Sequence, residues 1–158
     1  MNNNQTTHIP VLKDKLLFSY LQRIKKYVDA TFGAGNFTKA ILDSAKCSVI
    51  AIDQDPNAKE YANKISREYG DRFTFYNINF KDLLNVINIP VDGIVFDIGV
   101  SSMQLSNPQR EFSFDRDGPL DMRMNNSDSC NTITAKQLID SIQEEELANI
   151  IYKYGNER

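Results

Sequence analysis

The chain has 158 residues, a formal net charge of −3 and a hydrophobic fraction of 41%, values that suit one globular domain or little more. No apolar run approaches the roughly 18 residues of a membrane-spanning helix, and the negative charge argues against holding bare nucleic acid by bulk electrostatics. Two distant cysteines, Cys47 and Cys130, and a single histidine argue against a disulfide framework and a zinc site, and favour reduced thiols in the cytoplasm. Residues 1–7 are polar and are interpreted as a flexible tail.

Helices and strands are predicted to alternate along the first 98 residues. Apolar residues recur at helical spacing over 12–23, which predicts a helix there. Short apolar runs predict strands over 26–30, 49–53, 73–78 and 91–98. Helices are predicted between them, over 37–45, 56–69 and 81–86, the second with Asp55 as its N-cap and Pro56 at its first position. This alternation predicts a doubly wound α/β sheet of parallel strands.

The composition changes after Gly99. Residues 100–124 are rich in Gly, Pro, Ser, Asp and Arg, and we expect a long functional loop. Thr134 can cap a last helix over 135–152, which has its apolar residues on one side.

A glycine turn follows the first predicted strand, in the stretch Y-V-D-A-T-F-G-A-G-N over 27–36. Gly33 and Gly35 lack a Cβ, so the backbone can bend sharply and lie close to a ligand. A dinucleotide site would need a third glycine where Thr38 stands. The acid-x-Gly-x-Gly-x-Gly pattern of S-adenosylmethionine (SAM) methyltransferases fits better, with Asp29 as the acid and Thr31 in place of the first glycine.

Further polar residues follow the other predicted strands. Asp53 ends the second strand, where an acid can accept hydrogen bonds from both ribose hydroxyls of a nucleoside. That role suits NAD and SAM alike, and the alternative is a surface turn that caps a helix. In a doubly wound sheet the ligand lies beyond the carboxyl ends of the strands, and the polar residues singled out all fall there: Thr31, Gly33, Asp53, Asn79 and Asp97.

Several stretches resemble the RsmH (MraW) family: D-A-T-F-G-A-G, A-I-D-Q-D-P, F-D-I-G-V-S-S-M-Q-L, F-S-F-D-R-D-G-P-L-D-M-R-M and the closing Y-G-N-E-R. The resemblance runs from His8 to Arg158. It implies a Rossmann-like, SAM-dependent methyltransferase that acts on the exocyclic N4 of a cytidine in 16S ribosomal RNA, in the decoding centre of the small subunit. In such a sheet the strand order is 3-2-1-4-5-7-6, so the fourth strand lies between the first and a fifth.

The resemblance also implies which residues bind the cofactor, and it implies no metal. Gly33, Gly35, Asn36 and Phe37 occupy the cofactor-binding turn, although the family usually has Gly-Gly-His at 35–37. Asp53 matches the ribose-binding acid and Phe80 the aromatic residue beside the adenine. Asp97 and Gln104 match two further cofactor contacts. Asp97 is also the candidate for a proton acceptor in catalysis, and its alternative role is a structural N-cap.

Family members run to about twice this length, so the chain resembles their N-terminal half. We expect a tail over 1–7, a SAM-binding half-domain over 8–102 and part of a helical insert over 103–158. The alternatives are a homologue that keeps part of the SAM pocket without catalysis, and a nucleoside-binding domain of another class, such as a reductase.

Two sets of basic residues could contact RNA in an assembled small subunit: Lys13, Lys15, Arg23, Lys25 and Lys26, and the loop residues Arg110, Arg116 and Arg123. In the loop, charged residues could instead only lock its geometry. The fourth strand lacks a candidate partner on one side. We therefore expect that the last helix covers this edge, that the chain associates with itself through it, or that the chain is only marginally stable in solution.

Overall fold

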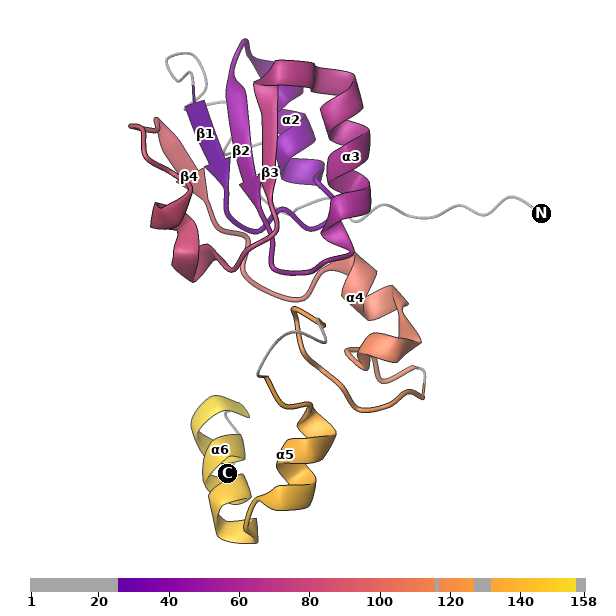
Figure 1. The fold of residues 1–158 in the computed structure, drawn as a ribbon. Helices are drawn as coiled ribbons and strands as arrows, with labels where there is room; N and C mark the ends of the chain where they lie inside the picture. The colour runs from indigo at the N-terminus through magenta and orange to yellow at the C-terminus, as the bar shows by residue number, and fades with distance from the viewer. Residues whose placement is uncertain (1–25, 116, 127–131, 156–158) are drawn as a thin grey trace, which may run out of the picture. The chain divides into compact units, whose positions relative to one another are not determined.

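The computed structural model describes residues 26–115, 117–126 and 132–155. The predicted tail over 1–7 and the predicted helix over 12–23 lie outside the described residues. The chain divides into two compact units, the first ending at Met103 and the second beginning at Gln104. Figure 1 shows the strands within the first unit and the helices α5 and α6 within the second.

A four-stranded parallel sheet forms the first unit. Its strands are β1 (Lys26–Asp29), β2 (Ser48–Ile52), β3 (Phe73–Tyr76) and β4 (Gly93–Val95), in the order β3-β2-β1-β4. Asp29, the last residue of β1, lies opposite Ala51 and Val95, so the carboxyl ends of β1, β2 and β4 reach the same edge. The predicted fold class, a doubly wound α/β sheet, is confirmed.

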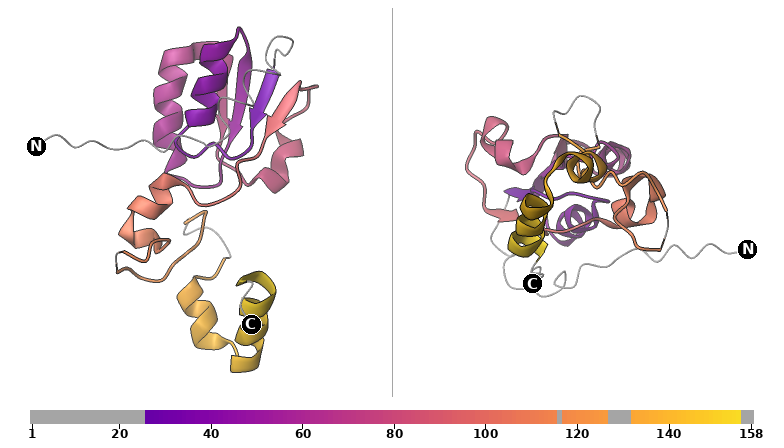
Figure 2. Two further views of the ribbon diagram at one scale, coloured as in Figure 1. Left: turned by 180° about the vertical axis from the view of Figure 1, so that it is seen from behind. Right: turned by 90° about the horizontal axis from the view of Figure 1, so that it is seen from below.

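Two helices, α2 (Asn36–Ser44) and α3 (Ala58–Tyr69), cover one face of this sheet, as the view from behind in Figure 2 shows. Side chains alternate between the faces of each strand. On the helix face Tyr27, Val49 and Phe73 pack with residues of α2 and α3. On the other face Val28, Ala30 and Ile52 are fully or almost fully buried, against Leu83 and neighbouring apolar residues around η2 (Phe80–Asn85), a 3-10 helix.

The fourth strand is shorter than predicted, three residues in place of 91–98. Its ladder with β1 ends where the amide of Ala30 donates to the carbonyl oxygen of Val95, at 2.9 Å. Beyond that point β1 turns into the glycine loop and offers no further extended backbone. The other differences in this unit are small. Helix α3 begins at Ala58, and a short 3-10 helix precedes β3. The predicted helix over 81–86 is the 3-10 helix η2.

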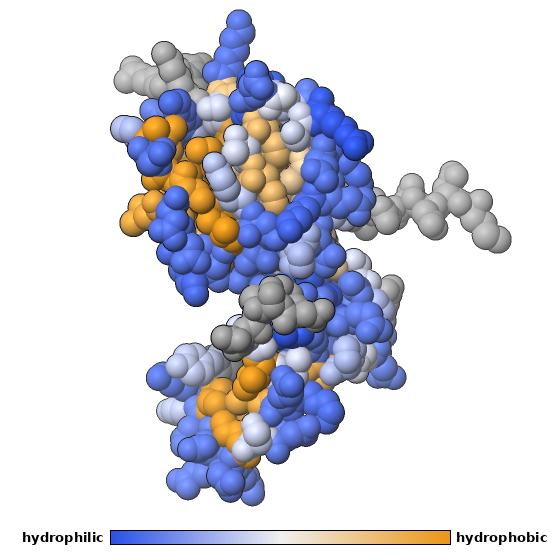
Figure 3. All heavy atoms as spheres, in the orientation of Figure 1, coloured by the Kyte–Doolittle hydropathy of each residue, from blue (hydrophilic) through white to orange (hydrophobic). Residues whose placement is uncertain are grey.

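One edge of the sheet carries exposed apolar side chains. Within the described residues β4 pairs only with β1. Figure 3 shows a hydrophobic area over β4 and the segment before it. The exposed apolar residues of this region are Leu84, Ile89, Ile94, Phe96 and Ile98. We name these five residues the β4 edge patch.

The second unit differs most from the predictions. The segment 100–124 is not simply a loop, because it contains α4 (Ser102–Ser106) and η3 (Pro108–Arg110). The single helix predicted over 135–152 is wrong: it is two helices, α5 (Ala135–Ser141) and α6 (Glu144–Gly155). Thr134 does cap α5, through a capping box with Gln137. No helix in the described parts of the chain combines the length and apolar character needed to cross a bilayer.

The break between α5 and α6 has a local cause. The hydroxyl of Ser141 donates to the carbonyl oxygens of Gln137 and Leu138, at 2.8 and 3.2 Å, and so competes with the helical backbone. Ile142 then adopts an extended conformation. Glu144 and the two acidic residues after it form the first turn of α6, where the helix dipole favours negative charge.

Candidate functional site

The glycine turn joins β1 to α2, and its two glycines are required for different reasons. Gly33 and Gly35 both have positive φ, 54° and 81°. Residues other than glycine adopt such backbone angles only at a cost in free energy. A Cβ on Gly35 would also clash with Ile65 and lie 2.8 Å from ring atoms of Phe32. Among the described residues, a Cβ on Gly33 would have only Ser101 within 4 Å, at 3.7 Å. Gly35 is therefore closed in by the core, whereas Gly33 leaves open backbone at the edge of the sheet.

A buried carboxylate holds the start of this turn. Asp29 is 1% exposed; one of its oxygens accepts from the amide of Thr31, at 3.2 Å, and the other from the hydroxyl of Thr38, at 2.7 Å. Burial, with a smaller contribution from the Asp53 carboxylate, raises the pKa of Asp29 to about 6, while the bonds from Thr38 and Thr31 act in the opposite direction. Asp29 thus ties β1, the turn and α2 together.

A second carboxylate reaches the turn from β2. Asp53 Oδ2 accepts from the amide of Gly33 at 2.6 Å, and its Oδ1 accepts from the amide of Asp55 at 2.8 Å. The amide of Phe32 donates to the carbonyl oxygen of Ile52, at 3.0 Å, which holds the turn beside the end of β2. Because a carboxylate oxygen has more than one acceptor position, Asp53 can serve the turn and still accept a hydrogen bond from a ligand.

The end of β4 meets the turn from the other side. The amide of Asp97 donates to Thr31 Oγ1 at 2.7 Å, and Ser101 lies beside Gly33. The carboxyl ends of β1, β2 and β4 therefore bring together three of the predicted site residues, Gly33, Asp53 and Asp97. Within this group the sequence prediction missed Asp29 as a site residue, although it is the acid of the motif that was recognised.

The end of β3 contributes an aromatic residue. Phe80, at the start of η2, is 40% exposed and Phe96 is 47% exposed; their ring centroids are 5.7 Å apart at an interplanar angle of 88°. Edge-to-face pairs of this kind are favourable. Asn79 caps η2 and donates to Gln54 Oε1 at 2.7 Å. Apolar rings and amide groups thus lie at the same ends of the strands as Asp29 and Asp53.

The remaining predicted site residues have different surroundings. Asn36 is the first residue of α2 and is partly exposed, whereas Phe37 is 9% exposed and faces the protein interior. Any contact from Phe37 to a ligand would be through its backbone at the start of α2. Gln104 is buried within α4, at the beginning of the second unit, and its role as a cofactor contact stays a prediction.

In the second unit, the buried Arg110 holds together the loop that carries the charged residues. Arg110 is 1% exposed and donates from Nη2 to the carbonyl oxygens of Arg123 and Met124, both at 2.8 Å. Arg123 in turn binds Asp121 through two nitrogens, at 2.9 and 2.8 Å, and lowers the pKa of that carboxyl. These contacts support the interpretation that the charges lock the loop.

The predicted basic patch of the loop needs correction in consequence. Arg110 is buried and cannot reach RNA, and the Arg123 side chain is only 17% exposed in its ion pair. Arg116 lies outside the described residues. Of the other basic set only Lys26 is described, and it is exposed at the start of β1.

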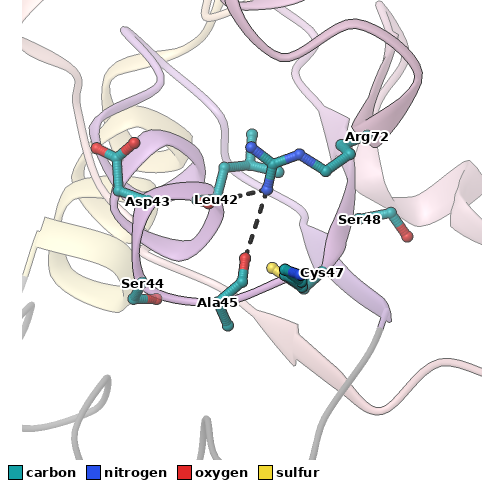
Figure 4. A pocket seen from close by; sticks show the side chains of 8 residues that line it. Leu42, Asp43, Ser44, Ala45, Cys47, Ser48 and Arg72 are labelled. Atoms are coloured by element: carbon teal, nitrogen blue, oxygen red, sulfur yellow. Dashed lines mark hydrogen bonds between the residues drawn. The ribbon is translucent and has the colours of Figure 1, made fainter.

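A pocket lies at the other end of the strands from the glycine turn. It lies where α2 ends and β2 begins (Figure 4), and is lined by residues 42–48 and Arg72. The guanidinium of Arg72 donates to the carbonyl oxygens of Leu42 and Ala45, at 3.0 and 3.4 Å. This arginine closes the end of a helix, and the pocket is at the amino ends of the strands, away from the edge where parallel sheets bind ligands.

Comparison with known proteins gives a consistent picture. The family model described as the MraW methylase family matches residues 5–158. The chain is 51% identical over 157 residues to ribosomal RNA small subunit methyltransferase H of a Wolbachia species, covering 96% of this chain and 53% of that relative. It is 47% identical over 152 residues to the protein of the same name from Rickettsia prowazekii, covering 95% and 48%. The chain thus spans about half the length of these curated relatives.

A solved structure agrees on the fold. A candidate rRNA methylase from Clostridium thermocellum superposes with a TM-score of 0.51 at 22% identity, covering 60% of this chain and 54% of that chain. At this level of identity the likeness concerns the fold, a Rossmann-like sheet.

Proposed function

The chain belongs to the MraW methylase family, and from that premise we propose that it binds SAM at the carboxyl ends of β1, β2 and β4 and serves methyl transfer to small-subunit ribosomal RNA. The observation that carries this proposal is the Asp53 carboxylate, 2.6 Å from the amide of Gly33. The acid that we propose binds the ribose and the backbone of the glycine turn are therefore in direct contact. The names of the relatives support the RNA substrate.

The residues present fit this cofactor. Where a Cβ on Gly33 would stand, Ser101 is the only neighbour within 4 Å in the described part of the chain. In our proposal Asp53 accepts hydrogen bonds from the ribose, Phe80 lies against the adenine, and Asn36, Gly35 and the backbone of Phe37 line the turn. Asp97 completes the set within the first unit, and Gln104 stays a contact that only the family resemblance implies. We place this site in a half-domain over 8–102, followed by part of an insert over 103–158.

SAM rather than NAD is favoured by the start of α2. A dinucleotide site uses a third glycine there so that helix and strand pack closely. This chain has Thr38, whose side chain is fully buried and donates to Asp29. A threonine with a structural hydrogen bond therefore occupies the position, and the turn keeps only Gly33 and Gly35.

The proposed reaction transfers a methyl group to the N4 amine of a cytidine in 16S ribosomal RNA. Bound SAM would supply a methyl group that is already activated by the positive charge of its sulfonium sulfur. What the protein must add is orientation of the amine, exclusion of water and acceptors for the amine protons. Asp97, an exposed residue whose backbone amide donates to Thr31 beside the turn, is the candidate acceptor.

The predicted substrate is the assembled small subunit rather than naked RNA. A net charge of −3 provides little counterion release on a bare strand, and Arg110 and Arg123 are committed to internal contacts. We expect tritiated methyl from SAM to enter small subunits that lack the modification in preference to naked 16S RNA. Because β4 pairs only with β1 among the described residues, we also expect the rate of this chain alone to fall far below that of a full-length relative.

The measurement is scintillation counting of both substrates at physiological salt, followed by nucleoside analysis for N4-methylcytidine. Preference for naked RNA would contradict the first expectation. A rate equal to that of the Rickettsia relative would contradict the second, and SAM binding without any transfer would favour the alternative of a binding homologue. We place the reaction in the cytoplasm, as the cysteine content suggested.

We further propose that isolated chains associate through the β4 edge patch, since an open strand edge with exposed apolar residues pairs readily with another copy. Sedimentation velocity should show a larger species whose fraction grows with concentration. Ile98, which is 77% exposed, can be changed without loss of core packing, and Ile98→Lys should return the chain to a monomer. Tyr152→Lys, at another exposed site, is the control. A wild-type monomer at every concentration would refute the association.

A further inference from the structure

At the carboxyl ends of β1 and β4, the contact between the two chain segments depends on the side chain of Thr31. The main-chain ladder between β1 and β4 ends with the bond from Ala30 to Val95. In a continued parallel ladder the amide of Asp97 would next donate to a main-chain oxygen of β1. It donates instead to Thr31 Oγ1, at 2.7 Å. The hydroxyl of Thr31 therefore takes the place of a backbone acceptor where the two strands diverge.

Thr31 is itself held from the other side. Its own amide donates to Asp29 Oδ1 at 3.2 Å, and Asp29 is buried and bound to Thr38. A rigid chain of contacts therefore runs from the core through Asp29 and Thr31 to the backbone of Asp97. Asp97 has no comparable burial, because it and the residues that follow it up to Val100 are exposed.

We propose that Thr31 is a positioning residue of the site: its hydroxyl fixes the backbone of Asp97 so that the carboxylate stands beside the glycine turn. The role rests on the proposed SAM site, to which Asp97 belongs. It also gives a reason for the departure of this turn from the all-glycine pattern, since a glycine at 31 could bend the chain but could not accept the Asp97 amide.

Isosteric variants test the hydroxyl. Thr31→Val replaces the hydroxyl by a methyl group of similar volume, and Thr31→Ser retains the acceptor. Loss of one hydrogen bond that fixes a ligand contact should lower affinity about three- to tenfold. In calorimetric titration with S-adenosylhomocysteine, we expect this loss for Thr31→Val and a value within about twofold of wild type for Thr31→Ser. Thr74→Val, at an exposed threonine of β3, is the matched control and should leave the affinity unchanged.

A double-variant cycle separates positioning from general stability. If Thr31 acts through Asp97, then Thr31→Val should have no further effect on affinity in an Asp97→Ala background. Amide hydrogen exchange gives a readout that needs no ligand: the Asp97 amide should exchange slowly in wild type and Thr31→Ser, and faster in Thr31→Val.

Each outcome decides the question. An unprotected Asp97 amide in the wild-type chain, an unchanged affinity of Thr31→Val, or the same loss in both backgrounds would overturn the positioning role and leave the proposed function intact. A wild-type chain that bound no S-adenosylhomocysteine would overturn the proposed function and the positioning role with it. Slow exchange together with non-additive losses would establish both.

Discussion

Replacing Asp53 with alanine is expected to weaken SAM binding by about tenfold to a hundredfold, because a hydrogen bond to a charged group contributes about 1.5–3 kcal/mol. The carboxylate stands at the end of β2 and already accepts from Gly33 at 2.6 Å. Its removal takes away the proposed ribose acceptor and also the hydrogen bond that holds the amide of Gly33. Calorimetric titration of both proteins with SAM measures the loss.

Asp55→Ala is the matched control for this experiment. Asp55 lies two residues away, is 1% exposed and accepts from the amide of Asn57 at 2.9 Å. Its removal should cost about 1 kcal/mol of stability, as for a lost helix cap, and leave the affinity for SAM within about twofold. Equal losses of affinity for the two variants would move the ribose contact away from Asp53.

The second large effect concerns pH. The pKa of Asp29 is raised from an ordinary 3.8 to about 6 in the folded chain, so the folded state binds more protons than the unfolded state between these values. The free energy of unfolding should therefore fall as pH rises through this window and level off above it. At about 1.4 kcal/mol for each pKa unit, ionisation of Asp29 should lower the free energy of unfolding by about 3 kcal/mol in total.

Asp29→Asn removes this titration and keeps groups that can bond to Thr31 and Thr38. Urea unfolding between pH 4.5 and 8, with the difference between variant and wild type taken at each pH, isolates the contribution. The variant should gain stability relative to wild type as pH rises from about 4 to 6. Asp71→Asn, at an exposed carboxylate, should follow the wild-type curve. A pH dependence that is the same in Asp29→Asn as in wild type would show that burial of Asp29 carries no such cost.

The sheet could be predicted because its strands are short apolar runs between polar turns, a pattern set by burial on both faces. The glycine turn and Asp53 were recognisable for a related reason, since ligand contacts at the carboxyl ends of parallel strands fall at defined places in the chain. Once the strands were placed, the set of buried side chains and the order of the strands followed from the same pattern. The length of β4 did not, because it depends on where β1 leaves the sheet, at Ala30.

The features that escaped prediction depend on side chains that meet only in the folded chain. The bond between Asp29 and Thr38 joins a strand to a helix, and nothing in either residue alone signals it. The burial of Arg110 could not be expected from its residue type, since arginine is usually exposed. It depends on two carbonyl oxygens of the folded loop that accept hydrogen bonds from its guanidinium. The end of α5 depends on one serine rotamer that bonds back to the helix.

The central claim, that this chain holds an S-adenosyl cofactor at the glycine turn, is tested most directly by titrating the wild-type chain with SAM, S-adenosylhomocysteine and NAD in parallel. We expect measurable binding of the two S-adenosyl compounds, with heat that disappears or shrinks in Asp53→Ala, and no comparable binding of NAD. Tighter binding of NAD, or S-adenosyl binding that is indifferent to Asp53, would contradict the account.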